Sequence, residues 1–95
     1  MTLEDQYKLL IESYYGIVLM NEYNLKEYAL KEIEKLIKDF ENNYDNIEYS
    51  NIREYVKTSV NDKTKLQSAL ITLNSIDYDI DLILLIKDKI KNTCK

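Results

Sequence analysis

The sequence predicts an all-α fold: a compact bundle of four to five short helices, mostly antiparallel, in a single domain spanning residues 1–95. The chain contains no proline and one glycine, and these two residues carry the largest helix penalties, about 3 and about 1 kcal/mol. Its residues are 45% hydrophobic and 32% charged, a balance that fills a core and keeps the surface polar. Short polar connections make neighbouring helices antiparallel, and a chain of this length fits one core.

The first helix is expected over residues 3–21. Thr2 and Asp5 have the spacing of a capping box. Gly16 weakens this helix by about 1 kcal/mol relative to alanine, and we hypothesise that it lets the backbone of the last helix approach closely. The apolar residues that recur at helical intervals are Leu3, Tyr7, Leu10, Ile11, Tyr14, Ile17 and Val18.

A second helix is expected over residues 25–41, where the chain carries its clearest apolar stripe. Asn24 followed by Glu27 repeats the cap signal. Residues 41–46 are rich in Asn and Asp, whose side chains bond the nearby backbone and compete with helix. The helix should therefore end there. Its core-facing residues are Leu25, Ala29, Leu30, Ile33, Leu36, Ile37 and Phe40.

Three shorter helices are expected in the second half of the chain. The third starts near Asn46 or after Ser50, and Asn61 with Asp62 offers a turn and a cap for the fourth. Residues 74–77 close the fourth helix and open the last, with Asp77 as its N-cap. The expected core residues are Ile52, Tyr55, Val56 and Val60 in the third helix, Leu66, Ala69, Leu70 and Leu73 in the fourth, and Ile80, Ile83, Leu84 and Ile90 in the last.

The segment from Leu82 to Ile86 is apolar all round. Such a segment forms a central helix packed on several sides, an exposed docking surface or a short buried strand. The length of the surrounding pattern favours a helix. Exposure of this segment would allow a homodimer.

The composition excludes most catalytic chemistry. With no histidine, the commonest general base and metal ligand is missing, and Ser-His-Asp or Cys-His nucleophile systems cannot be assembled. One glycine excludes a glycine-rich phosphate loop. Asp77, Asp79 and Asp81 alternate as in a calcium loop, but Leu82 stands where such a loop requires glycine. We therefore predict no enzymatic activity, no metal and no cofactor.

The sequence also predicts a cytoplasmic protein without membrane contact. A single cysteine, Cys94, cannot form an intramolecular disulfide, and the acidic start of the chain does not read as a secretory leader. The longest uncharged apolar runs, residues 14–20 and 82–86, are far shorter than the roughly 20 residues that span a bilayer.

Aromatic rings and carboxylates concentrate in residues 40–49, a stretch without lysine or arginine. Tyrosine offers a large contact area with few rotors and is enriched at binding hot spots. Carboxylates speed the encounter with a basic partner. The alternative is that these rings only cover the edge of the core. The candidate partner-binding residues are Glu41, Tyr44, Asp45, Glu48 and Tyr49.

Residues 52–74 carry the strongest signal for nucleic-acid binding. Two short helices joined at Asn61 and Asp62 resemble a helix-turn-helix in outline, and residues 63–76 contain no acid. The net charge of −4 and the missing turn glycine argue against this function. The candidate DNA contacts are Lys63, Thr64, Lys65 and Gln67.

We therefore expect a non-enzymatic protein-binding module. In size, charge and helicity the chain is similar to small immunity proteins of bacteriocin systems and to small phage inhibitors of host defence. This resemblance implies an inhibitor, immunity or anti-defence protein of bacterial, phage or mobile-element origin that occludes a basic site on a larger protein. The alternatives are a helix-turn-helix-like DNA-binding regulator and a homo-oligomeric scaffold subunit that pairs through Leu82 to Ile86.

Overall fold

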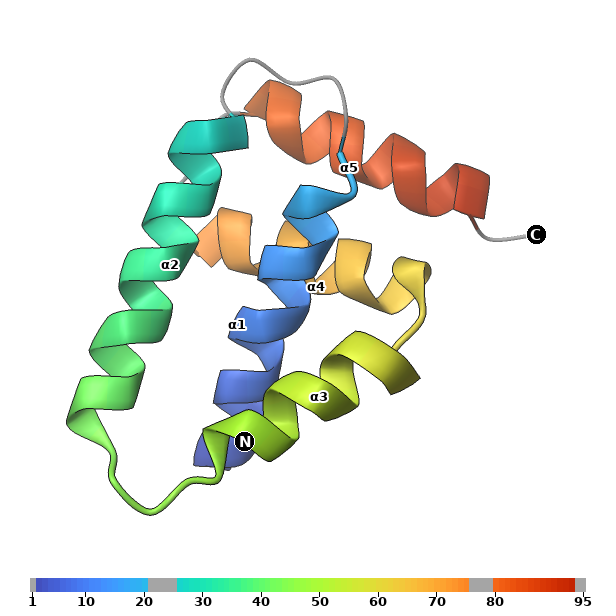
Figure 1. Cartoon of the computed structure of the whole chain (residues 1–95). Helices are drawn as coiled ribbons and strands as arrows, with labels where there is room; N and C mark the ends of the chain where they lie inside the picture. Colours follow the sequence, from blue (N-terminus) through green and yellow to red (C-terminus); the bar gives the residue numbers. More distant parts are fainter. Residues whose placement is uncertain (1, 21–25, 76–79, 94–95) are drawn as a thin grey trace.

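A computed structural model describes residues 2–20, 26–75 and 80–93, and within these ranges the chain forms helices and no strand. The all-α prediction is confirmed. The predicted cap at Asn24 and the predicted turn and cap at residues 76–77 lie outside the described ranges. The helices are α1 (Leu3–Val18), α2 (Lys26–Asn43), α3 (Tyr49–Ser59), α4 (Asp62–Ser75) and α5 (Ile80–Thr93) (Figure 1).

The first helix is the centre of the bundle. Helices α2, α3 and α4 all pack against α1, whereas α5 packs mainly against α4. Figure 1 shows α2 antiparallel to α1, α4 crossing behind α1, and α5 running antiparallel to α4. A central, multiply packed last helix is therefore not what forms, although the helical prediction for residues 82–86 is confirmed.

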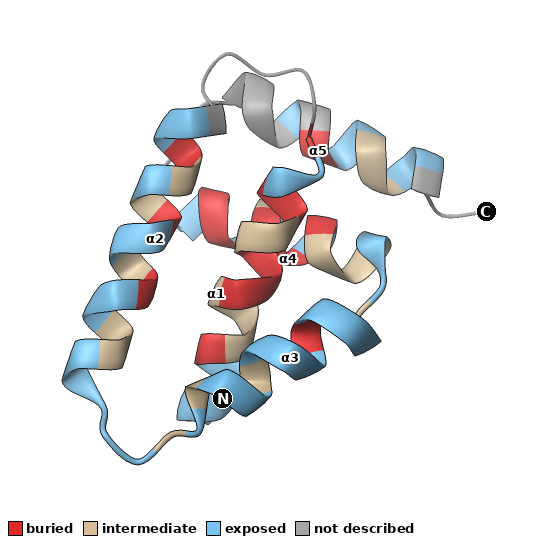
Figure 2. Cartoon of the chain, viewed as in Figure 1, coloured by how far each residue is buried: buried red, intermediate tan, exposed pale blue. Residues whose placement is uncertain are grey.

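The core forms where the predicted stripes meet α1, and Figure 2 shows the buried residues gathered along the helix sides that face it. Among the described residues, four expected core residues are exposed instead: Leu3 at 39%, Val18 at 39%, Tyr55 at 52% and Leu84 at 53%. Leu3 and Val18 are the end residues of α1. Helix α3 packs chiefly on α1, so only the narrow stripe through Val56 is fully buried. The buried apolar residues are Tyr7, Ile11, Ile17, Met20, Ala29, Ile33, Ile37, Val56, Leu66, Ala69, Leu73 and Ile86.

Two predicted helix caps are present. The hydroxyl oxygen of Thr2 accepts a hydrogen bond from the backbone N–H of Asp5 at 3.1 Å. The side-chain oxygen of Asn61 accepts one from the backbone N–H of Thr64 at 2.9 Å. Each bond satisfies a donor in the first turn that has no partner inside its own helix.

The close backbone approach expected at Gly16 is present, but with a different helix. A Cβ added at this position would lie 2.7 Å from the carbonyl carbon of Lys65, closer still to its oxygen, and 3.0 Å from the Cβ of Ala69. The neighbour is therefore α4 and not the last helix. The reason is that α4 crosses α1 directly, whereas α5 packs mainly on α4.

A buried polar layer also joins α1 to α4, and no sequence pattern predicted it. The Ser13 hydroxyl lies 2.7 Å from the carbonyl oxygen of Ser68 and 2.5 Å from the Thr72 hydroxyl. The Ser68 hydroxyl donates to the Glu12 carboxylate at 2.6 Å. All four side chains are buried, and hydrogen bonding offsets the cost of removing them from water.

Removing the Ser68 hydroxyl, which donates a hydrogen bond to the Glu12 carboxylate, should destabilise the protein. We expect Ser68→Ala to cost about 2 kcal/mol, because the buried Glu12 carboxylate loses a hydrogen-bond donor and retains the Lys8 ammonium at 4.0 Å. We expect Thr72→Val to cost about 1 kcal/mol. Urea denaturation of both variants measures this difference. Ser59→Ala, at an exposed position on α3, is the control. A Ser68→Ala cost no larger than that of the control would contradict the role of the layer.

Candidate partner-binding surface

The five predicted partner-binding residues lie at one end of the bundle, around the connection between α2 and α3 (Figure 1). Glu41 belongs to the last turns of α2, and Tyr49 is the first residue of α3. Tyr44, Asp45 and Glu48 lie between these helices. The five residues differ in how they are bonded and therefore in what they can contribute to binding.

Glu41 is bonded inside the protein. Its Oε2 atom accepts hydrogen bonds from the Tyr7 hydroxyl at 2.6 Å and from Nη2 of Arg53 at 2.5 Å, and Nε of Arg53 donates to the Tyr7 oxygen at 2.7 Å. These three groups close a ring that joins α1, α2 and α3. Residues 40–49 contain no lysine or arginine, but Glu41 is paired with a base all the same, because the fold brings Arg53 from outside this stretch.

The hydrogen-bonded ring of Tyr7, Glu41 and Arg53 changes the ionisation of all three side chains. Burial, and then the hydrogen bond to Glu41, raise the pKa of Tyr7 to about 12. Burial acts to raise the pKa of Glu41, but hydrogen bonds from Tyr7 and Arg53 outweigh it and lower that pKa overall. The hydrogen bond to Glu41 is the main cause of the raised pKa of Arg53. A neutral phenol, a carboxylate and a guanidinium therefore coexist over a wide pH range.

Tyr49 has a structural role in the same region. Its ring lies 4.6 Å from that of Tyr7, centroid to centroid, and packs edge-on to Phe40. Its hydroxyl donates to the backbone oxygen of Tyr44 at 2.5 Å and lies 3.4 Å from that of Phe40. Carbonyl groups at the end of a helix lack partners within it, so Tyr49 stabilises the end of α2 and shapes the connection that follows.

The other three candidates are exposed. The Tyr44 side chain is 39% exposed, and its ring lies 4.7 Å from that of Phe40, centroid to centroid. Asp45 and Glu48 are exposed, and the Glu48 carboxylate accepts a hydrogen bond from the side-chain amide of Asn51. The Tyr44 ring, which packs on Phe40, offers contact area. The carboxylates of Asp45 and Glu48 beside it add charge.

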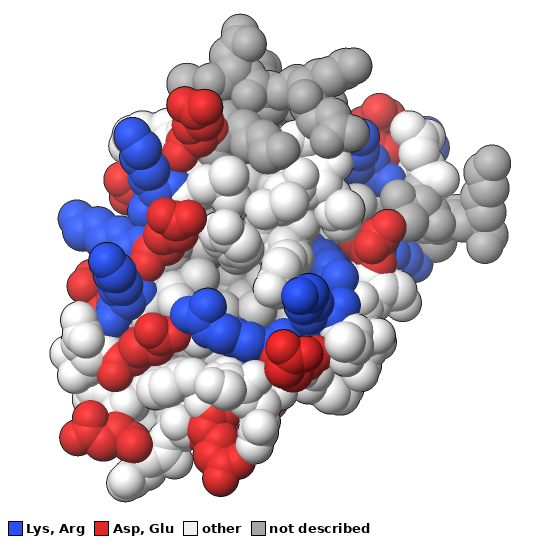
Figure 3. Space-filling view, viewed as in Figure 1, with Lys and Arg blue, Asp and Glu red and all other residues white. Residues whose placement is uncertain are grey.

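The first turn of α1 adds two acids, Glu4 and Asp5, that are not among the predicted partner-binding residues. Glu4 and Glu48 line one hollow of about 330 Å³, and no lysine or arginine is among its lining residues. Glu4 and Asp5 line a neighbouring hollow of about 220 Å³ together with Lys8 and Tyr55. Figure 3 shows acidic and uncharged side chains at this end of the visible face. We call Glu4, Asp5, Tyr44, Asp45 and Glu48 the acidic end.

The candidate DNA contacts lie on the first turns of α4, apart from the acidic end. Lys63, Thr64 and Lys65 are partly buried, and Gln67 is exposed. The Thr64 hydroxyl bonds the Asn61 side chain at 3.0 Å, and the Lys65 ammonium lies 5.5 Å from the ring centroid of Tyr15. Helix α4 packs broadly on α1, so its inner face belongs to the core.

The proposed dimer segment is described only in part. Leu84 is 53% exposed and Ile86 is fully buried, which fits a helix with one side on the core. The side chains of Leu82, Ile83 and Leu85 lie outside the described residues.

The described residues also bear on metal binding and on membrane insertion. Among the described residues, no group of three or more Cys, Asp or Glu side chains is arranged to hold a metal ion. Within the same ranges, no helix combines the length and apolarity needed to cross a membrane. Asp77, Asp79 and Cys94 lie outside the described residues.

No protein-family model, curated protein or solved structure matches this chain.

Proposed function

We propose that this protein is a non-enzymatic binding module, a small acidic inhibitor of the immunity or anti-defence kind, which occludes a basic site on a larger protein. The observation that carries the proposal is the juxtaposition of Glu4 with Glu48. They come from distant parts of the sequence, yet they share a hollow without a basic lining residue. We place the protein in the cytoplasm, as its composition suggests.

The acidic end has the physical properties that such binding requires. Carboxylates speed the diffusional encounter with a basic surface. Tyr44, and Tyr55 beside the acidic end, are 39% and 52% exposed and supply aromatic contact area at low rotamer cost. Glu41 and Tyr49 contribute indirectly, because their bonds to Arg53 and to the backbone hold the connection in place. This arrangement supports recognition by a preformed surface.

The helix-turn-helix alternative has less support. A recognition helix must present one face to the major groove, whereas α4 packs broadly against α1. Three of the four candidate contacts are partly buried. The formal net charge of −4 also opposes approach to the phosphate backbone.

Reversing charge at the acidic end should strongly weaken partner capture. We expect Asp45→Lys with Glu48→Lys to reduce capture about tenfold or more, which corresponds to a loss of roughly 1.4 kcal/mol in binding free energy. Tagged protein is incubated with lysate of its source cell or host, and the retained proteins are quantified by mass spectrometry. Circular dichroism verifies that the variant is folded.

A charge-matched variant separates a local surface effect from a general charge effect. Glu54→Lys with Asp88→Lys changes the net charge by the same amount at exposed positions on α3 and α5. The partner that wild-type protein captures should remain bound to this control. Equal retention by both double variants would refute a role for the acidic end.

A further inference from the structure

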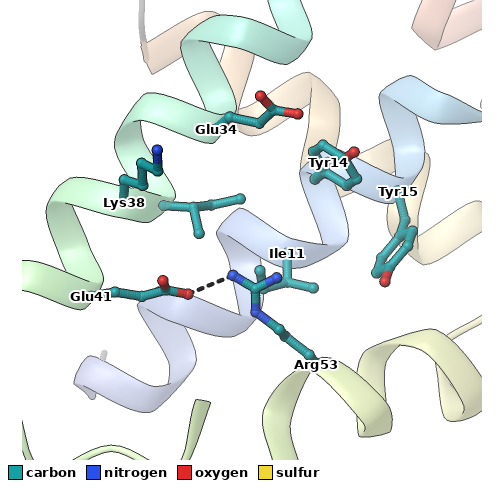
Figure 4. A pocket seen from close by; sticks show the side chains of 8 residues that line it. Ile11, Tyr14, Tyr15, Glu34, Lys38, Glu41 and Arg53 are labelled. Atoms are coloured by element: carbon teal, nitrogen blue, oxygen red, sulfur yellow. Dashed lines mark hydrogen bonds and ion pairs between the residues drawn. The ribbon is translucent and has the colours of Figure 1, made fainter. Parts of the chain in front are cut away.

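A pocket of about 430 Å³ lies between α1, α2 and α3 (Figure 4). Its apolar lining comes from Ile11 and Ile37 and from the rings of Tyr14 and Tyr15, which meet edge to face at 5.6 Å between centroids. The volume falls within the range of about 300 to 1,000 Å³ that is typical of small-ligand sites. None of the residues that line it belongs to the acidic end.

The charged side chains of this pocket are unevenly distributed. Figure 4 shows Glu34 at one side of the cavity and Arg53 at the opposite side, with Ile11 beside Arg53. Lys38 and Glu41 complete the lining on the α2 side. Glu41 is bound to Arg53 and Tyr7 through one carboxylate oxygen. The lining therefore carries two carboxylates and two cationic groups, and Arg53 is the cation that lies across the cavity from Glu34 (Figure 4).

Arg53 is held in a fixed orientation. One edge of its guanidinium, formed by Nε and Nη2, donates to the Tyr7 hydroxyl at 2.7 Å and to Glu41 at 2.5 Å. The end of the group is directed toward the cavity (Figure 4). A guanidinium has five N–H donors, so donors remain beyond those used in the ring. The pocket that these remaining donors enter is lined by isoleucine and tyrosine side chains. A ligand that supplies an acceptor oxygen to Arg53 therefore gains the most there.

We propose that this pocket binds a carboxylate with an apolar body. The two oxygens of a carboxylate match the fork of an arginine, and Lys38 adds a second positive charge at the same cavity. The apolar body covers Ile11, Ile37 and the tyrosine rings. Such a group occurs in a free aliphatic or aromatic acid and at the C-terminal residue of a peptide chain, and both present the same chemistry to Arg53.

Two matched pairs of probes test the proposal by heteronuclear NMR titration of the intact protein. The first pair is 4-phenylbutyrate and its primary amide, and the second is N-acetyl-Ala-Ala-Phe with a free carboxylate and with a C-terminal amide. Saturable shifts should cluster at residues of α1, α2 and α3 around the pocket. Each acid should bind about tenfold more tightly than its amide, since the amide lacks the charge that Arg53 recognises.

Variants test the assigned residues. Lys38→Gln should weaken binding of the acids several-fold, whereas Lys35→Gln, at an exposed position on the same helix, should leave it unchanged. Tighter binding of the tripeptide acid than of phenylbutyrate identifies a peptide terminus as the source, and the reverse order identifies a free acid. Equal affinity of acids and amides, or no saturable shift with either acid, would overturn the proposal. Either result leaves the acidic end unaffected.

Discussion

Replacing Gly16 with alanine is expected to destabilise the protein by about 2 kcal/mol, although helix propensity alone favours alanine by about 1 kcal/mol. The added Cβ would lie 2.7 Å from the carbonyl carbon of Lys65. This neighbour is backbone and cannot rotate away, so α4 must move as a unit. Thermal and urea denaturation, followed by circular dichroism, measure the loss.

Leucine at position 16 should have the larger effect and prevent α4 from docking on α1, because its side chain needs space that Lys65 and Ala69 occupy. Gln6→Ala is the matched control, since Gln6 is exposed on the same helix and surface changes usually stay within about 0.5 kcal/mol. A Gly16→Ala protein as stable as wild type would show that the two helices separate without cost.

Replacing Tyr7 with phenylalanine is expected to cost about 2 kcal/mol at neutral pH. The variant retains the buried ring but removes the hydroxyl that donates to Glu41 and accepts from Arg53, and hydrogen bonds to charged groups contribute roughly 1.5 to 3 kcal/mol. The remaining contact between Arg53 and Glu41 is partly exposed, so solvent screens what it adds. Urea denaturation of both proteins measures the difference.

The same pair of proteins has a pH signature. The pKa of Tyr7 is raised to about 12 in the folded state from 10.0, so the folded protein retains the neutral phenol while the unfolded chain ionises. The stability advantage is present below pH 10 and is lost as the pH rises toward 12, a change of about 3 kcal/mol. Wild type should lose its advantage over Tyr7→Phe across this interval. Parallel curves for the two proteins would refute the raised pKa.

The helices could be predicted because their determinants are local. Apolar spacing is visible within each segment, and the caps at Thr2 and Asn61 lie next to the helices they start. The exposure of Tyr55 could not be predicted from the apolar spacing of α3, because that spacing does not indicate how few helices pack against α3. Gly16 signalled a close approach, but one sequence does not identify which helix approaches.

The candidate site was predicted only in part, because its decisive features join distant segments. The acids at residues 45 and 48 were visible in the sequence, but nothing connected them with Glu4. Arg53 lies outside residues 40–49, and only the packing of α3 on α1 brings it to Glu41. The polar layer around Ser13 was missed for the same reason, since isolated serines in a helix carry no recognisable pattern.

The ring of Tyr7, Glu41 and Arg53 also fixes the two ends of the connection that carries Tyr44, Asp45 and Glu48. Glu41 precedes that segment and Arg53 follows it, and both are bonded to the same phenol of the central helix. Most of the conformational entropy of the segment is therefore lost during folding and not on association. A partner that docks there gains affinity from rigidity, chiefly as a slower rate of dissociation.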